Sequence, residues 1–224
     1  RQDFPKYDRK AILELCLCLR HLKRLTINEH TISIEDNENE RKITIDGRAQ
    51  TFRKFIHHFS INDIEAIKER ENGIHGVSVD QKIVCYIPER INTSSTSDYR
   101  LYNGLPTKQR INIPMAIDAP FELTTSREEI ETSLSKWNNI ILEEMYTAII
   151  DVMLSLRDGE KENILSFARF LHRRHGMEIV YHNDISDCVF VKGYPFAARL
   201  RNCDILPTYE PGVYVSSNTI GAYR

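Results

Sequence analysis

Residues 105–130 have the sequence LPTKQRINIPMAIDAPFELTTSREEI, and we expect the fold to be organised around them. The run divides into a short loop, LPTKQR, an apolar strand, INIPMAIDAPFEL, and a turn, TTSREEI. We expect the turn to open the longest helix of the chain. The functional interpretation depends on how this strand, turn and helix are used.

The long helix is predicted from apolar residues that recur every three or four positions, the spacing of one helix face. We expect Thr125 or Ser126 to cap its free amides, with Glu128 or Glu129 completing a capping box. The apolar stripe predicts a core helix with Trp137 facing inward. Its members are Ile130, Leu134, Trp137, Ile141, Met145, Ala148 and Val152.

Arg127 does not suit the first turn of this predicted helix. The helix dipole disfavours a cation at the N-terminal end by a few tenths of a kcal/mol up to about 1 kcal/mol. An ion pair with Glu128 or Glu131 would give it a structural role. Alternatively, the arginine is held at the strand-to-helix corner to receive an anion such as a nucleotide phosphate. The residues alone leave both interpretations open.

The strand, the Ser-Arg-Glu turn, the helix and the following WNNII resemble the middle segment of the sacsin-like proteins. These are relatives of the heat-shock-ninety chaperones within the GHKL ATPase superfamily. The resemblance covers residues 105–139 and, more faintly, residues 5–34. In the chaperones, the arginine of the matching motif reaches the terminal phosphate of ATP held in a separate N-terminal domain. The resemblance implies the same catalytic contact for Arg127, with Ser126 and Glu128 beside it.

Two further positions complete the nucleotide-binding set that the resemblance implies. The chaperone glutamine four residues beyond the arginine corresponds to Glu131, where this chain departs from the family by carrying a carboxylate. Lys108 is the candidate for the lysine that a mismatch-repair-type GHKL protein supplies from the same fold. The expected cofactor-binding residues are therefore Arg127, Ser126, Glu131 and Lys108.

The resemblance also implies an α/β (α+β) fold, a mixed-sheet sandwich like the second domain of ribosomal protein S-five. Residues 1–157 would form this middle domain, and residues 158–224 a second, smaller and truncated α/β unit. The middle domain would couple nucleotide state to domain movement and act on a client or partner protein. ATP and Mg²⁺ would bind mainly in an N-terminal domain of the same chain. We expect the sequence, which starts without methionine, to be an excised fragment of that chaperone-like ATPase.

Two alternatives belong to other functional classes. One is a non-catalytic protein-interaction scaffold in which the arginine is vestigial, and the other is a mismatch-repair-type transducer domain that acts with DNA. Arg100, Lys108 and Arg110 next to Tyr99 and Tyr102 would suit nucleic acid. However, three cations are few, and the net charge of -2 gives no electrostatic attraction to DNA.

Composition and motifs exclude several other classes of protein. No Walker loop, GxGxxG turn, HExxH or GxSxG is present. The Asn-bearing helix and glycine-rich lid with which GHKL proteins bind ATP are also missing. We therefore expect that this chain alone does not hydrolyse ATP. Five scattered cysteines predict reduced thiols, and no signal peptide or membrane-length apolar run occurs, so we expect a cytoplasmic protein. No metal site is expected, because adjacent residues such as His57 and His58 face opposite ways on a strand.

The remaining elements are predicted from apolar spacing and turn residues. We expect a helix or a buried strand that becomes a strand near Leu25, a hairpin over residues 25–46, a helix or strand over 52–59, a helix over 61–73 capped by Ser60 or Asn62, a strand over 79–88 and an exposed loop over 89–100. After a break at 157–159 we expect a helix over 162–176, strands over 177–182 and 187–193, a short helix over 194–203 and a strand over 212–217.

Overall fold

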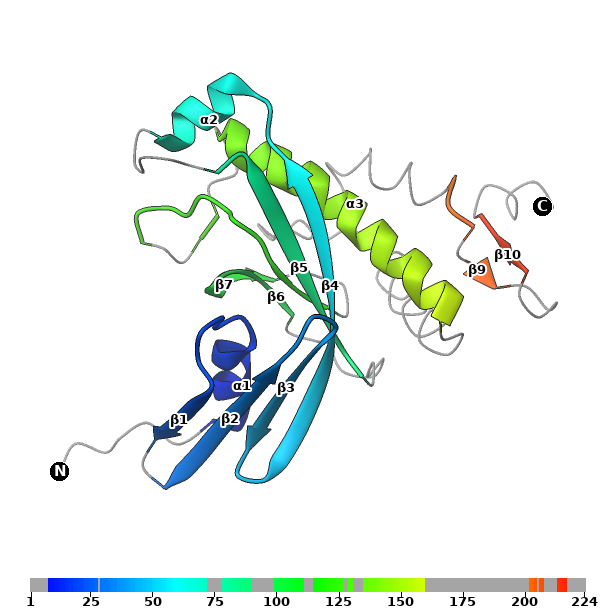
Figure 1. Ribbon diagram of the computed structural model, residues 1–224. Coiled ribbons are helices and arrows are strands. Elements are labelled where there is room, and N and C mark those ends of the chain that lie inside the picture. The colour runs from blue at the N-terminus through cyan, green and yellow to red at the C-terminus, as the bar shows by residue number, and fades with distance from the viewer. Residues whose placement is uncertain are drawn as a thin grey trace, which may run out of the picture.

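The computed structural model describes residues 8–27, 29–71, 78–89, 99–110, 115–126, 129–130, 135–159, 202–204, 206–207 and 213–216. Within these ranges the elements follow one another as shown in Figure 1. They are α1 (Arg9–Leu17), β1 (Arg24–Ile27), β2 (His30–Asp36), β3 (Glu40–Ile45), β4 (Arg48–Ser60), α2 (Ile64–Glu71), β5 (Asp80–Pro88), β6 (Arg100–Asn103), β7 (Leu105–Arg110), β8 (Ala116–Asp118), α3 (Lys136–Gly159), β9 (Leu206–Pro207) and β10 (Tyr214–Val215).

The described strands form one large mixed sheet and one small sheet. The large sheet has eight strands in the order β1-β2-β3-β4-β5-β8-β6-β7, and β10 pairs with β9 in the second. Every pairing is antiparallel except that of β6 with β8, which is parallel. The predicted α/β fold with a mixed sheet is thus confirmed.

The first four strands form a meander because apolar residues alternate along them and tight turns connect them. Ile43 and Ile45 of β3 are buried on one face, as are their neighbours on β2. Asp46 and Gly47 both have positive φ, 52° and 76°, as a two-residue hairpin turn requires. Of the hairpin predicted over residues 25–46, the β2–β3 pair is confirmed, whereas residues 25–27, expected in its first strand, belong to the separate strand β1, and β4 extends the hairpin.

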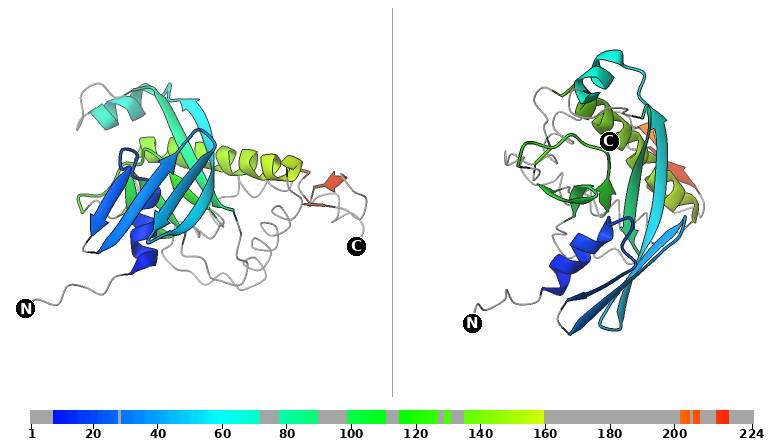
Figure 2. Two further views of the ribbon diagram at one scale, coloured as in Figure 1. Left: turned by 60° about the horizontal axis from the view of Figure 1, so that its bottom comes forward. Right: turned by 60° about the vertical axis from the view of Figure 1, so that its left-hand side comes forward.

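Helix α3 covers one face of the central strands. Alternate residues of β5, among them Ile83 and Cys85, pack with Trp137 and Ile141 in one core cluster. The inward stripe predicted for the long helix is therefore correct from Trp137 onward, where Trp137 is 1% exposed. The right-hand view of Figure 2 shows α3 running along β4 and β5.

Helix α1 covers the opposite face. Val84 and Tyr86, which alternate along β5 with the residues of the first cluster, belong to a second core cluster. This cluster includes Cys16 of α1 and Cys18, which follows the helix. Successive side chains of a strand point to opposite faces, so β5 contributes to both cores. The view in Figure 2 places α1 and α3 on opposite sides of these strands. The prediction that these two cysteines are core residues is confirmed.

The C-terminal end of α3 meets the small sheet. Arg157 donates from Nη1 to the Asp204 carbonyl over 2.9 Å, and Tyr214 Oη donates to the Arg157 carbonyl over 3.1 Å. Helix α3 continues through the break predicted at 157–159. The strand predicted over 212–217 is confirmed as β10, whereas the elements predicted between 162 and 193 lie outside the described residues, and so does most of the helix predicted over 194–203.

The structure corrects several sequence predictions and decides one that was open. Residues 105–110 form strand β7 rather than a loop, and residues 52–59, for which a helix and a strand were both considered, belong to the long strand β4. The apolar strand predicted after residue 110 is described only as the short β8. Helix α2 begins at Ile64, because Asp63, rather than Ser60 or Asn62, accepts hydrogen bonds from the amides of Glu65 and Ala66.

Candidate functional site

The described residues on either side of the Ser-Arg-Glu motif do not belong to the long helix. Leu123 and Ile130 form an antiparallel bridge, and the Thr124 amide donates to the Glu129 carbonyl over 2.8 Å. We call the described residues 122–126 and 129–130 the Ser-Arg-Glu loop. Ile130 is buried, but because it forms this bridge it does not belong to the helical stripe. The predicted capping box at Thr125 or Ser126 is therefore wrong.

Helix α3 begins later, at Lys136, because other groups satisfy its first amides. The Asn138 amide donates to Ser135 Oγ over 3.1 Å, which makes Ser135 the N-cap. The Lys136 amide donates to Glu69 Oε2 of α2, also over 3.1 Å. The N-terminal amides of a helix lack partners within the helix. Here the cap residue and a neighbouring helix provide them.

Two buried side chains in the first turn of α3 hold residues 120–122, which lead into the Ser-Arg-Glu loop and which we call its root. Trp137 Nε1 donates to the Pro120 carbonyl over 2.8 Å. Asn138 accepts from the Glu122 amide at Oδ1 over 2.6 Å and donates from Nδ2 to the Glu122 carbonyl over 2.8 Å. The backbone that enters the loop is thus fixed against α3 by three hydrogen bonds.

The Glu122 side chain adds a second tie between the loop and the helices. Its Oε2 accepts from Ser135 Oγ over 3.1 Å, and its Oε1 lies 3.8 Å from Arg70 Nη1 of α2. The guanidinium of Arg70 also lies over the Trp137 ring, 5.8 Å from its centroid. Both α2 and α3 therefore contribute to the root.

Strand β6 holds the root from the other side. Asn103 Nδ2 donates to the Phe121 carbonyl over 2.7 Å, and the Ala119 amide donates to the Tyr102 carbonyl over 3.0 Å. The chain between β8 and the loop therefore lies between α3 and β6. The Ser-Arg-Glu loop extends from an anchored segment.

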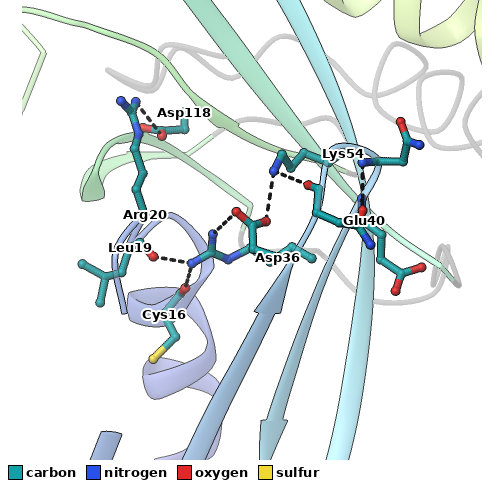
Figure 3. Close-up of polar contacts among 10 residues, drawn as sticks. Cys16, Leu19, Arg20, Asp36, Glu40, Lys54 and Asp118 are labelled. Carbon is teal, nitrogen blue, oxygen red and sulfur yellow. Dashed lines mark hydrogen bonds and ion pairs between the residues drawn. The ribbon is translucent and has the colours of Figure 1, made fainter. Parts of the chain in front are cut away.

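Asp118, directly before this segment, is a buried carboxylate. Its Oδ2 accepts from Arg20 Nη2 over 3.1 Å, and its Oδ1 accepts from the Gly104 amide over 2.8 Å. Gly104 has a φ of +71°, which suits a residue without a Cβ. Arg20 follows α1, so the ion pair visible in Figure 3 connects the N-terminal layer to the end of β8.

A second polar cluster lies at the C-terminal end of α1. Arg41 is 1% exposed and donates from Nη2 to the carbonyls of Cys16 and Leu19, the former over 3.1 Å. Its Nη1 lies 3.4 Å from Asp36 Oδ2, and Lys54 Nζ donates to Asp36 Oδ1 over 3.0 Å. Figure 3 shows Asp36 and Lys54 beside the end of the helix. The helix dipole favours a cation at a helix C-terminus. We therefore assign this cluster a role in stabilising the fold.

The predicted nucleotide-binding residues are only partly described. Arg127 and Glu131 lie outside the described residues, as does Glu128. Ser126 is exposed in the Ser-Arg-Glu loop, where its Oγ is 3.0 Å from Thr124 Oγ1. Lys108 is exposed on the edge strand β7, which β6 separates from β8.

Not all of the aromatic and basic residues considered for nucleic acid are available to a ligand. Tyr102 is buried, and burial also raises the pKa of Tyr99 to about 12. Arg100 Nη1 donates to the Thr107 carbonyl over 3.2 Å, and its Nε is 3.5 Å from Glu14 Oε2. Tyr102 and Arg100 are thus engaged with the protein itself.

His57 is part of a cluster that the sequence analysis missed. Its Nε2 is 3.0 Å from Glu144 Oε2, and its Nδ1 is 3.4 Å from Asp151 Oδ2, so α3 places a carboxylate beside each ring nitrogen. A pocket of about 230 Å³ adjoins it, lined by Phe55, Ile56, His57, Cys85, Ala148, Asp151, Val152 and Ser155. The sequence signal for this cluster was the seven-residue spacing of Glu144 and Asp151, which corresponds to two helical turns. Within the described ranges, no three His, Cys, Asp or Glu residues are placed to hold a metal.

No known protein family, curated protein or solved structure matches the chain. Among the helices of the described ranges, none has the length and apolar character needed to span a membrane.

Proposed function

We propose that the chain is the middle, or transducer, domain of a chaperone-like GHKL ATPase. In this proposal its mixed sheet and helices correspond to the sandwich of the second domain of ribosomal protein S-five. The starting point is the resemblance of residues 105–139 to the sacsin-like proteins. Nucleotide would bind in an N-terminal domain of the same chain, in the cytoplasm, and the movement would act on a client or partner protein.

The anchoring of the Ser-Arg-Glu loop is the observation that best supports this proposal. An arginine that serves a nucleotide held by another domain must extend from the surface, yet its position must be fixed if it is to act in the transition state. The Leu123 bridge to Ile130 closes the loop, and Trp137 and Asn138 fix its root. The described residues that flank Arg127 are therefore held in place, which is a property that the proposal needs.

The proposed chemistry assigns charge stabilisation to Arg127. A guanidinium can donate two parallel hydrogen bonds to phosphate oxygens. An arginine supplied from outside a nucleotide site contributes on the order of a thousandfold or more to phosphoryl transfer. Ser126 would offer a neighbouring hydroxyl donor. ATP supplies the transferred phosphoryl group, and Mg²⁺ with the attacking water would be held by the N-terminal domain.

Replacement of Arg127 in the full-length protein tests this function. Arg127→Ala should lower ATP turnover by at least about tenfold, equivalent to roughly 1.4 kcal/mol of transition-state stabilisation. The melting temperature should hardly change. Lys108→Ala is the matched comparison, because a mismatch-repair-type domain would depend on that lysine instead. Unchanged turnover of Arg127→Ala in a folded, ATP-hydrolysing protein would reject the assignment and leave the scaffold alternative.

A further inference from the structure

The pocket of about 230 Å³ beside His57 is lined by residues of β4, β5 and α3, and most of its described lining is apolar. Phe55 and Ile56 come from β4, whereas α3 contributes Ala148 and Val152. Well-packed protein interiors contain few voids larger than a water molecule. An apolar cavity of about 150 Å³ is enough to admit benzene. The pocket therefore has room for a molecule that consists of one aromatic ring and a short substituent.

The charged groups at this pocket favour a positively charged ligand. Asp151 Oδ2 lies 3.4 Å from His57 Nδ1, and Glu144 Oε2 lies 3.0 Å from Nε2 of the same ring. One imidazole carries at most one positive charge, so it cannot balance two carboxylates in either protonation state. Neither lysine nor arginine belongs to the described residues that line the pocket. The cluster is therefore net negative and attracts a cation.

Asp151 is the carboxylate that a ligand in the pocket can reach. It belongs to the lining, and 59% of its side chain is exposed, compared with 18% for His57. A carboxylate has about four lone-pair sites, so the contact with His57 leaves acceptor capacity for a second donor. The imidazole is held in place, because it stacks on the Phe59 ring with centroids 6.0 Å apart. The pocket thus combines an apolar wall with an accessible anionic acceptor.

We propose that the pocket binds a small organic cation, in which a primary ammonium group is attached to an apolar body about the size of one aromatic ring. The ammonium donates to Asp151, and the body packs against Phe55, Ile56 and Val152, where it is removed from water. A charge-assisted hydrogen bond is about twice as strong as one between neutral groups, so the cation is preferred over a neutral molecule of equal size. The inference involves none of the residues assigned to the nucleotide and does not depend on that function.

Benzylamine, benzyl alcohol and benzoate are matched probes, because they share the ring and differ in charge. Each is titrated near neutral pH into the ¹⁵N-labelled 224-residue chain, and the backbone amide shifts of the described lining residues report binding at this pocket. Benzylamine should bind with a dissociation constant on the order of 1 mM or lower, at least about tenfold below that of benzyl alcohol. Benzoate should give no saturable shift, because Asp151 repels it.

Asp151→Asn removes the charge and keeps the shape of the side chain. It should weaken benzylamine binding at least about tenfold, to the level of benzyl alcohol, whose own affinity should not change. Glu143→Gln is the matched control, because it removes the same charge from an exposed position of α3 outside the described lining. In that control, both affinities should stay within about twofold of the unmodified protein at physiological salt.

Three results would overturn the proposal. Equal affinity for benzylamine and benzyl alcohol would reveal an apolar cavity without preference for a cation. Undiminished benzylamine binding in Asp151→Asn would show that this carboxylate does not receive the ammonium. The third is the absence of shifts at the lining residues with benzylamine at about ten times the expected dissociation constant. Each result leaves the assignment of Arg127 untouched, because that assignment uses no residue of this pocket.

Discussion

Arg41 shows how a single charged side chain can be buried in this fold. It lies in the same row of β3 as Ile43 and Ile45, yet its exposed fraction is 1%. Its guanidinium donates to the carbonyls of Cys16 and Leu19, where the end of α1 leaves acceptors without helical partners. The arginine thus joins the end of a helix to a strand distant in sequence.

We expect Arg41→Ala to destabilise the protein by roughly 3 kcal/mol, because it leaves the buried carbonyls without donors and removes a partner of Asp36. Arg24→Ala, at an exposed position of β1, should change stability by less than about 0.5 kcal/mol. Urea unfolding of both variants measures the difference. Equal stability of the two variants would show that the buried contacts of Arg41 contribute nothing net.

Cys85 makes stability depend on alkaline pH. Burial raises the pKa of its thiol to about 12, and the nearby Asp151 adds to the shift. In the unfolded chain the pKa of the thiol is about 8.5. Between these two values the unfolded state loses its proton and the folded state keeps it. Stability should therefore be independent of this group below about pH 8.5 and fall above it, by up to about 1.4 kcal/mol per pH unit.

Comparison with Cys85→Ala isolates this effect from other titrations, including those of buried tyrosines. Between about pH 8 and about pH 10, the unmodified protein should lose about 2 kcal/mol more stability than Cys85→Ala. Denaturant unfolding at the two pH values provides the measurement. A parallel decline in both proteins would mean that the Cys85 thiol is not protected from ionisation in the folded state.

At the scale of elements, the start of α3 is the point at which sequence and structure differ most. Two segments carry N-terminal signals, with Thr125 and Ser126 before three glutamates and Ser135 two residues before Trp137. The first signal is stronger by pattern alone. The structure uses the second, because Leu123 and Ile130 pair with each other and are not part of the helix, and such a pairing depends on tertiary contacts.

The two candidate caps can be compared directly. Ser135→Ala should reduce stability by about 1 kcal/mol, because the Asn138 amide loses its acceptor and Glu122 loses a donor. Thr125→Ala, which removes the hydroxyl that the sequence favoured, should change stability by less than about 0.5 kcal/mol. Thermal and urea unfolding of the pair provides the test. A larger loss for Thr125→Ala would contradict the helix start at Lys136.

Local patterns predicted the elements whose burial follows a simple period. The β2–β3 hairpin was predicted because Ile32, Ile34, Ile43 and Ile45 alternate with polar residues, and the inward face of α3 was predicted from its helical spacing. Strand β4 was ambiguous because Phe52, Phe55 and Phe59 suit a helix or a strand. The contacts of Asn138 and His57 could not be predicted, since each joins segments far apart in the chain.

At the scale of the whole molecule, two separate cores share one sheet, and polar contacts connect them. Strand β5 supplies alternate residues to both clusters. The pair of Arg20 with Asp118 ties the α1 layer to β8, and the chain then passes directly to the segment held by Trp137 and Asn138. Residues 118–122 therefore receive contacts from both layers.

If the chain is the responding half of a divided nucleotide site, it should bind ATP weakly by itself. A charge-assisted hydrogen bond contributes about 1.5–3 kcal/mol, whereas a dissociation constant of about 1 mM requires about 4.1 kcal/mol. The sequence offers Arg127 as the arginine proposed for such a site and lacks the asparagine-bearing and glycine-rich motifs of a complete site. Titration calorimetry should therefore show no saturable ATP binding below about millimolar concentration, with or without Mg²⁺. The Arg127→Ala variant should give the same flat titration. Tight, Mg²⁺-dependent binding by this chain would mean that it holds the nucleotide itself, and the proposed division of the site between two domains would be wrong.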